Sequence, residues 1–231
     1  IMGLSYLISA SIVILAHYEQ VPTVFASIIL GAFNPEAGLG GAVGLSVRQV
    51  IITGVKRAIF SNEAGVGTEA LAHSTAKTTQ PIREGFVGML GPIIDTHLIC
   101  TATALVILTS DSYSENGILA TAEAFEKTMP GVGATILTSI FVAFAFSTLV
   151  TYAFYSLRCS SYLLGQKLGP NFLWVYLFFI MVAPTWKAET AIHLIDIAFA
   201  LMVIPNLIAS FVLAPKVKDA LNHYIRYSVK N

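Results

Sequence analysis

Long runs without charged side chains constrain this chain more than any other feature. No charged residue occurs from Gly133 to Leu157, and none from Asn171 to Trp186. A helix crosses a bilayer core about 30 Å thick with about 20 mainly apolar residues. These runs predict an all-α polytopic membrane protein and argue against an ordinary soluble domain.

The overall composition agrees with this prediction. Only 11% of the 231 residues are charged, against about 25% in a typical soluble domain, and the mean hydropathy is +0.75. Thirteen Lys and Arg residues balance thirteen Asp and Glu residues, and no basic block marks a nucleic-acid interface, so no nucleic-acid partner is expected. Cys100 and Cys159 lie in apolar runs without the spacing of a zinc site or a disulfide framework, and we expect buried, inert thiols.

Enzymatic chemistry has no visible basis in the sequence. No HExxH, GxSxG or Walker pattern occurs, so neither the nucleophile nor the metal ligands of a hydrolytic enzyme can be recognised. We therefore expect a protein that is not an enzyme and that carries no cofactor.

The remaining apolar segments contain polar interruptions. Asp95 and Asp196 fall about midway along two of them, and a hydrogen bond or ion pair with Ser, Thr or Lys of a neighbouring helix is the first role expected for each.

The whole chain, 1–231, is expected to form a single transmembrane domain. The further expected spans are Gly85–Thr109, Thr190–Ala214, Leu4–Ala16 with a following helix from Pro22 to Phe33, Gly40–Ala76 as a broken span, and an extension of the Asn171 span back to Gly165.

Basic residues in the loops predict the orientation, because cytoplasmic loops carry the excess of Lys and Arg. Two basic loop residues, Lys127 and Lys187, fall on one side of the membrane. Eight fall on the other side, namely Lys77, Arg83, Arg158, Lys167, Lys216, Lys218, Arg226 and Lys230. The larger set places the carboxyl terminus inside, with 216–231 as a cytoplasmic basic tail that is either an interfacial helix or a frayed end. Between Asp111 and Met129 the pattern predicts an outer amphipathic helix that ends at Pro130-Gly131 and has an apolar face of Ile118, Leu119, Ala122, Phe125 and Met129.

The stretch 60–67, Phe-Ser-Asn-Glu-Ala-Gly-Val-Gly, predicts a break in an apolar helix. Gly65 and Gly67 permit unusual backbone angles, and Asn62 can cap the next helix. An interrupted helix exposes carbonyls, here near Phe60, that suit a cation or ammonium group, and amides that suit an anion. An ordinary membrane-surface loop between two short helices stays an alternative. Lys56, Arg57 and Glu63 are expected to pair with each other or to face water.

Hydroxyl groups gather in the longest uncharged run. Ser147 and Thr148, with the carbonyl of Phe144, offer oxygen ligands without a carboxylate, which suit a monovalent cation. The alternative is that each hydroxyl bonds back to its own helix at i−4.

The segment 54–67, Gly-Val-Lys-Arg-Ala-Ile-Phe-Ser-Asn-Glu-Ala-Gly-Val-Gly, closely resembles the signature of the alanine/glycine:cation symporters, also called sodium:alanine symporters. The likeness continues through Asp95-Thr96, 100–104, Ser147-Thr148 and 205–209. The resemblance implies a leucine-transporter-like fold of two inverted five-helix repeats, each with a broken first helix. By this analogy the chain is an N-terminally truncated fragment that carries helices five to ten.

The same resemblance implies a function and its residues. It implies sodium-coupled symport of small neutral amino acids, alanine or glycine, across the plasma membrane, by alternating access around a site at the broken helix. Na+, the amino acid and the lipid bilayer are then the partners. The alternatives are proton coupling through Asp95 or Glu63, and a non-enzymatic membrane subunit. The implied substrate-binding residues are Phe60, Ser61, Asn62, Gly65 and Gly67, and the implied sodium ligands are Ser147, Thr148 and the carbonyl of Phe144.

Overall fold

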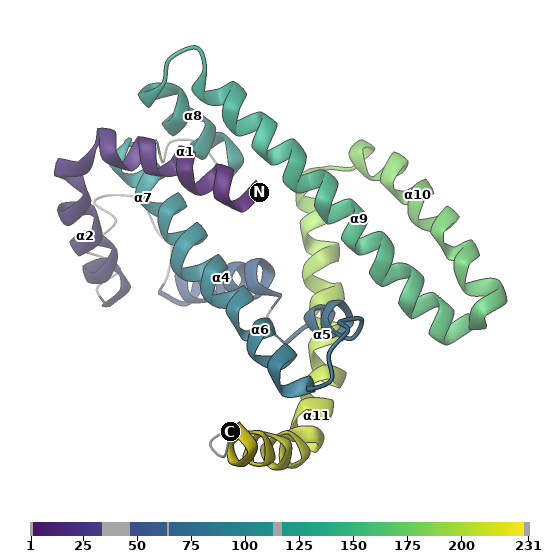
Figure 1. The fold of residues 1–231 in the computed structure, drawn as a ribbon. Helices are drawn as coiled ribbons and strands as arrows, with labels where there is room; N and C mark the ends of the chain where they lie inside the picture. Colours follow the sequence, from purple (N-terminus) through teal and green to yellow (C-terminus); the bar gives the residue numbers. More distant parts are fainter. Residues whose placement is uncertain (1, 34–46, 64, 113–116, 229–231) are drawn as a thin grey trace. The chain divides into compact units, whose positions relative to one another are not determined.

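A computed structural model describes residues 2–33, 47–63, 65–112 and 117–228, and these form helices joined by turns (Figure 1). Of the expected broken span, residues 40–46 lie outside the described residues. In chain order the elements are α1 (Met2–Ala16), η1 (Tyr18–Gln20), α2 (Val21–Phe33), α4 (Val47–Asn62), α5 (Thr68–His73), α6 (Pro81–Ile93), η2 (Ile94–Cys100), α7 (Thr101–Thr109), α8 (Ile118–Thr128), α9 (Gly133–Leu168), η3 (Gly169–Asn171), α10 (Phe172–Val182), η4 (Ala183–Thr185) and α11 (Ala188–Ser228).

The chain divides into two compact units. The first contains Ile1–Gly54 and Ile93–Leu149, and the second contains Val55–Pro92 and Val150–Asn231. Each unit is therefore built from two separate stretches of sequence.

The first unit has a small core where α1, α7, α8 and α9 meet. Tyr6 of α1 stacks on Phe125 of α8 with ring centroids 6.5 Å apart. The Tyr6 hydroxyl donates a hydrogen bond to Thr103 Oγ1 at 2.5 Å, because the Thr103 hydroxyl itself donates to the Ile99 carbonyl. A buried tyrosine therefore has a partner for its polar end. The buried core residues are Tyr6, Ala10, Val13, Val106, Ala124, Phe125 and Leu137.

Several helices are long and apolar enough to cross a membrane. Among the described residues these are Pro81–Thr109, Gly133–Thr185 and Ala188–Arg226, and a fourth if Met2–Ala16 and Tyr18–Gly31, bent by 81°, form one span. Large apolar side chains on them are exposed, as with Met181 at 80%. Apolar surface of this extent fits a lipid environment, so the described helices support a multi-pass membrane protein.

The polar residues of the Pro81–Thr109 span coincide with an irregular helix. Residues Ile94–Cys100 form a π-helix directly after Pro92. Within it, the Cys100 thiol donates to Asp95 Oδ2 at 3.8 Å, and Thr101 Oγ1 donates to the Thr96 carbonyl at 3.1 Å. Both contacts join residues five apart, which is the spacing of a π-helix.

The second unit reverses its chain direction between α9 and α10. Gly165 has φ 79° and ψ 168°, which interrupts the helix, and the Ser160 hydroxyl donates to the Gly169 carbonyl at 2.9 Å. A Cβ at Gly169 would lie 2.4 Å from the Cα of Ser161, so only glycine fits this turn. Figure 1 shows α10 running back from the turn. Its 11 residues span about 16 Å, which is half a bilayer core.

The carboxyl-terminal helix is longer than the expected span. α11 continues past Pro205 and Pro215 to Ser228, and Figure 1 shows its last turns taking a new direction. The described part of the basic tail is thus helical and is not a frayed end.

A helix forms as expected at Ile118–Thr128. Of its expected apolar face, Phe125 is buried in the core of the first unit, and Ile118 and Leu119 are exposed. The expectation for the two cysteines was wrong. Neither cysteine is buried, since Cys159 is exposed and Cys100 only half-buried.

A pH dependence follows from the junction between α8 and α9. The Glu126 carboxylate accepts hydrogen bonds from the backbone N–H groups of Gly131 at 2.6 Å and Ala134 at 3.1 Å. These two bonds hold the pKa of Glu126 below its usual range. The resulting stabilisation is present above the ordinary Glu pKa of about 4.3 and is lost as the pH falls through the lower pKa of the folded state.

Glu126→Gln should therefore lower the melting temperature in detergent at pH 7, and the gap to the wild type should close below about pH 4. Glu123→Gln is the matched control on the same helix, where the carboxylate pairs with Lys127 Nζ at 2.8 Å. A gap that stays constant across this pH range contradicts the assignment.

Candidate functional site

The break expected at 60–67 is present in the second unit. α4 ends at Asn62 and α5 begins at Thr68, and positive φ angles occur at Glu63 (48°), Gly65 (76°) and Gly67 (94°). Val66 and Thr68 are buried, at 3% and 2% exposure, which does not fit an exposed surface loop. The helix is therefore interrupted at the expected place, but α4 and α5 are not among the described segments long and apolar enough to span a membrane.

Asn62 does not cap α5. It lies in the last turn of α4, where its Nδ2 donates to the Ala58 carbonyl at 3.1 Å. The N-cap position of α5 is occupied by Gly67, which has no side chain that could cap the helix. The left-handed φ at that position explains the preference for glycine.

Glu63 holds the two sides of the break together. Its Oε1 accepts a hydrogen bond from the Tyr152 hydroxyl of α9 at 2.5 Å, and its Oε2 accepts one from the Thr68 hydroxyl at the start of α5. A half-buried carboxylate with two hydroxyl donors is satisfied without a basic partner. The partners of the Glu63 carboxylate are therefore these two hydroxyls, and not the expected Lys56 or Arg57.

Helix α11 runs along α4 toward the break. Lys56 Nζ lies 3.6 Å from Asp196 Oδ2, so Asp196 has the lysine partner that the sequence suggested. One turn further along α4, the ring of Phe60 lies 5.8 Å from that of Phe199. The partners advance in the same direction along both helices.

The five expected substrate-binding residues flank or form the break. Phe60 and Ser61 are exposed and Asn62 is half-buried at the end of α4, while Gly65 and Gly67 lie inside the break. They thus come together on one backbone segment, and no described contact tests their role toward an amino acid.

The expected sodium ligands lie in the first unit, on α9. The Thr148 hydroxyl donates to the Phe144 carbonyl at 3.0 Å, which is the i−4 bond of the alternative interpretation. Phe144 and Thr148 also line a mostly apolar groove of about 570 Å³ together with residues of α8. Two of the proposed ligands are therefore adjacent in space, and they belong to a different unit from the break.

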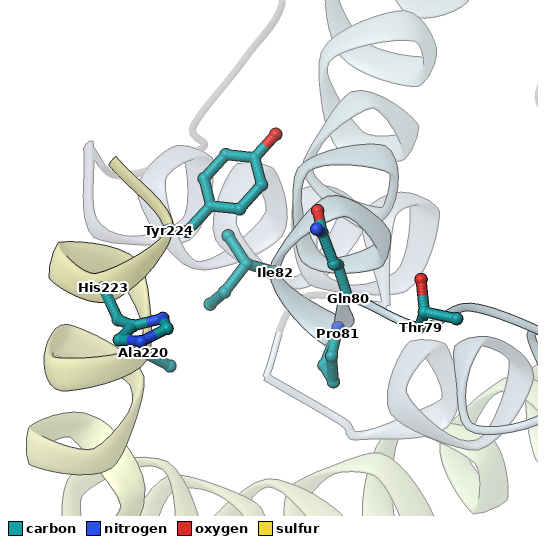
Figure 2. A pocket seen from close by; sticks show the side chains of 7 residues that line it. All are labelled: Thr79, Gln80, Pro81, Ile82, Ala220, His223 and Tyr224. Atoms are coloured by element: carbon teal, nitrogen blue, oxygen red, sulfur yellow. The ribbon is translucent and has the colours of Figure 1, made fainter. Parts of the chain in front are cut away.

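A second groove is lined by other parts of the chain than the proposed sodium ligands. It measures about 420 Å³ and is lined by residues that open α6 and by residues of the last turns of α11 (Figure 2). Tyr224 lies there beneath the Arg83 guanidinium, whose Nε donates to its hydroxyl at 3.3 Å. None of the expected site residues lines this groove; its lining residues are Thr79, Gln80, Pro81, Ile82, Ala220, His223 and Tyr224.

The sequence reasoning missed three residues that shape the break. Tyr152 directly follows the hydroxyl cluster that ends at Thr151, and Thr68 directly follows the glycines. Asn206 is an amide next to Pro205 in an apolar run, and its Nδ2 donates to the Gly65 carbonyl at 2.9 Å. A polar side chain amid apolar residues was the available signal, but nothing in the sequence identified its partner.

Several helices long and apolar enough to span a membrane, with a glycine-containing break in the second unit, fit the class of multi-pass membrane proteins. The model of the sodium:alanine symporter family matches residues 1–231. The chain belongs to this family, which is one of transporters and not of enzymes.

Curated relatives are identical to the chain at about a third of the aligned positions. It is 34% identical to a probable sodium/glutamine symporter, GlnT, of Bacillus subtilis, over 98% of this chain and 47% of that protein. It is 32% identical to the sodium/alanine symporter AgcS of Methanococcus maripaludis, over 100% of this chain and 52% of that protein. A sodium/proton-dependent alanine carrier protein of Bacillus sp. is 32% identical, over 96% of this chain and 54% of the relative. The chain thus spans about half the length of the curated relatives it matches.

The Glu63 network can be tested by removing one hydroxyl. Tyr152→Phe leaves Glu63 Oε1 without its donor, and a buried acceptor that loses its partner costs about 1–3 kcal/mol. We expect a loss of this size in the free energy of unfolding in mixed micelles.

Tyr155→Phe is the matched control, because it removes a hydroxyl from the same helix and leaves the bond from Tyr152 to Glu63 in place. If both substitutions lower the free energy of unfolding equally, the hydrogen bond from Tyr152 to Glu63 makes no specific contribution to stability.

Proposed function

We propose that the protein carrying this chain is a sodium-coupled symporter of small neutral amino acids, alanine or glycine. Transport proceeds by alternating access around a site at the break between α4 and α5, in the plasma membrane. The observation that carries the proposal is the buried break with its three positive φ angles, in the segment that bears the family signature. Broken membrane helices supply substrate and ion ligands in secondary transporters.

In this proposal the break binds the amino acid. Carbonyls at the end of α4, near Phe60, Ser61 and Asn62, accept hydrogen bonds from the ammonium group, since the last carbonyls of a helix lack intrahelical partners. Gly65 and Gly67 let the backbone turn away from α4 and approach the ligand closely. The substrate class is supported by the family and by relatives named for alanine and for glutamine.

Sodium binds, in the same proposal, to the oxygens of Ser147, Thr148 and the Phe144 carbonyl. Thr148 Oγ1 and the Phe144 oxygen lie 3.0 Å apart, so one ion could contact both once it replaces the hydrogen bond between them. Neutral oxygens suit a monovalent cation. If sodium favours the conformation that binds the amino acid, the amino acid strengthens sodium binding by the same factor.

The wider architecture is also part of the proposal. The chain corresponds to helices five to ten of a leucine-transporter-like fold, with the carboxyl terminus in the cytoplasm. The eight loop and tail basic residues on one side support this orientation, as does a helical, basic end of α11.

Proton coupling is the second candidate. It is supported by Glu63, an ionisable side chain held inside the break by Tyr152, and by a relative named as a sodium/proton-dependent alanine carrier. Alanine uptake that persists without sodium and follows an imposed pH gradient favours this candidate over sodium coupling.

The sodium site is tested in cells that express the complete gene product. Ser147→Ala combined with Thr148→Ala should raise the sodium concentration that gives half-maximal alanine uptake by at least about tenfold, since each 1.4 kcal/mol of lost binding is a factor of ten.

Thr138→Ala combined with Ser139→Ala is the matched control, because it removes two adjacent hydroxyls of the same helix that also bond back at i−4. Unchanged sodium dependence in the first double variant overturns the ion-site assignment.

Substrate preference is measured separately by competition. Unlabelled alanine or glycine should suppress uptake of labelled alanine at lower concentrations than glutamine, because the proposed pocket takes small side chains. Stronger suppression by glutamine contradicts the proposed substrate class and leaves sodium coupling untouched.

A further inference from the structure

The backbone of the break is contacted by one side chain of α11. Asn206 Nδ2 donates a hydrogen bond to the Gly65 carbonyl at 2.9 Å, across 141 positions of sequence. Positive φ angles on both sides of residue 64 carry this carbonyl out of a helical ladder. A carbonyl without an intrahelical partner at membrane depth needs one from elsewhere in the protein, and Asn206 provides it.

The same side chain fits against Gly67. A Cβ at position 67 would lie 2.9 Å from Asn206 Oδ1 and 3.1 Å from its Cγ. At Gly65 the nearest atoms to a built Cβ are Leu207 Cδ2 at 3.8 Å and Val203 Cγ1 at 3.9 Å, which is ordinary contact. The amide of Asn206 therefore occupies the space that a side chain at position 67 would need.

Asn206 differs from the other α11 residues that face this region. Asp196 and Phe199 contact side chains of the regular helix α4, whereas Asn206 binds the backbone of the break itself. The contacts of Asp196 and Phe199 bear on the position of α4, whereas the amide of Asn206 bears on how the chain turns after it. The neighbouring Pro205 has no backbone N–H, so the carbonyl of Leu201 loses its donor in the ladder of α11.

We propose that Asn206 is a positioning residue, which holds the break in the geometry that binds the amino acid through the Gly65 carbonyl and the space at Gly67. This inference rests on the proposed function of the break. Asn206 contacts backbone and not substrate, so its loss lowers the fraction of protein in the binding-competent geometry. Apparent affinity falls by that fraction, while the maximal rate at saturating substrate is retained.

The transport test uses the complete gene product with Asn206→Asp and Asn206→Leu. Both remove the donating amide at similar size, and agreement between them separates the lost donor from the added charge. We expect KM for alanine to rise about tenfold, with a maximal rate within about twofold of the wild type.

Asn222→Asp and Asn222→Leu are the matched controls, on the same helix at an exposed side chain. Folding is checked by the melting temperature in detergent. A folded Asn206 variant with unchanged KM, or with a loss confined to the maximal rate, overturns the proposal.

A second measurement does not depend on transport. Amide hydrogen exchange of peptides that cover 63–68 should be faster in both Asn206 variants than in the Asn222 controls, because local opening of the break becomes easier. If the wild type carries no amino acid but exchange changes as expected, the proposed function fails and the contact stands. Unchanged exchange overturns the role of Asn206 even where transport is intact.

The space at Gly67 gives an independent check. Gly67→Ala and Gly65→Ala both place a side chain at positive φ, but only the first meets Asn206. We expect Gly67→Ala to lower the melting temperature more than Gly65→Ala. In combination with Asn206→Ala, its effect should be smaller than additive, as measured in a double-mutant cycle. Equal effects of the two glycine substitutions, or full additivity, overturn the fit between Asn206 and Gly67.

Discussion

A series of side-chain contacts from α11 to α4 and its break positions the break within the second unit. It begins with the ion pair of Lys56 and Asp196 at 3.6 Å, continues through the rings of Phe60 and Phe199, and ends where Asn206 binds the Gly65 carbonyl. A helix end inside a membrane leaves polar backbone groups that lipid cannot satisfy. A neighbouring helix solves this problem, because its side chains can be directed at the opening.

Polar side chains on both flanks of the break share this task. Glu63 accepts hydrogen bonds from Tyr152 of α9 and from Thr68 of α5, so the carboxylate at one edge is held by two elements while Asn206 holds the middle. Each contact involves a group that is costly to leave unpaired away from water. The break is therefore a specified conformation, since glycines alone permit many backbone paths but do not select one.

The sequence allowed the all-helical class, the break and the amphipathic outer helix to be predicted, because each follows from local composition. Residues 63–67 indicate a break through their glycines, and Asp196 suggested a lysine partner by its position in an apolar run. The partners of Glu63 could not be predicted, since Tyr152 lies 89 positions away. The partners of Phe125 could not be predicted for the same reason, because Tyr6 and Val106, with which it forms a core, lie far away in the sequence.

Helix α9 connects the two sets of proposed ligands along one backbone. Thr148, which bonds the Phe144 carbonyl, and Tyr152, which bonds Glu63, are four residues apart and so occupy the same face one turn from each other. An ion that takes the Phe144 carbonyl as a ligand competes with the Thr148 hydrogen bond, and the adjacent turn carries the residue that holds the break. In the proposed symporter, sodium binding therefore replaces one hydrogen bond within α9, and the contact of the ion with the Phe144 carbonyl has to offset that loss.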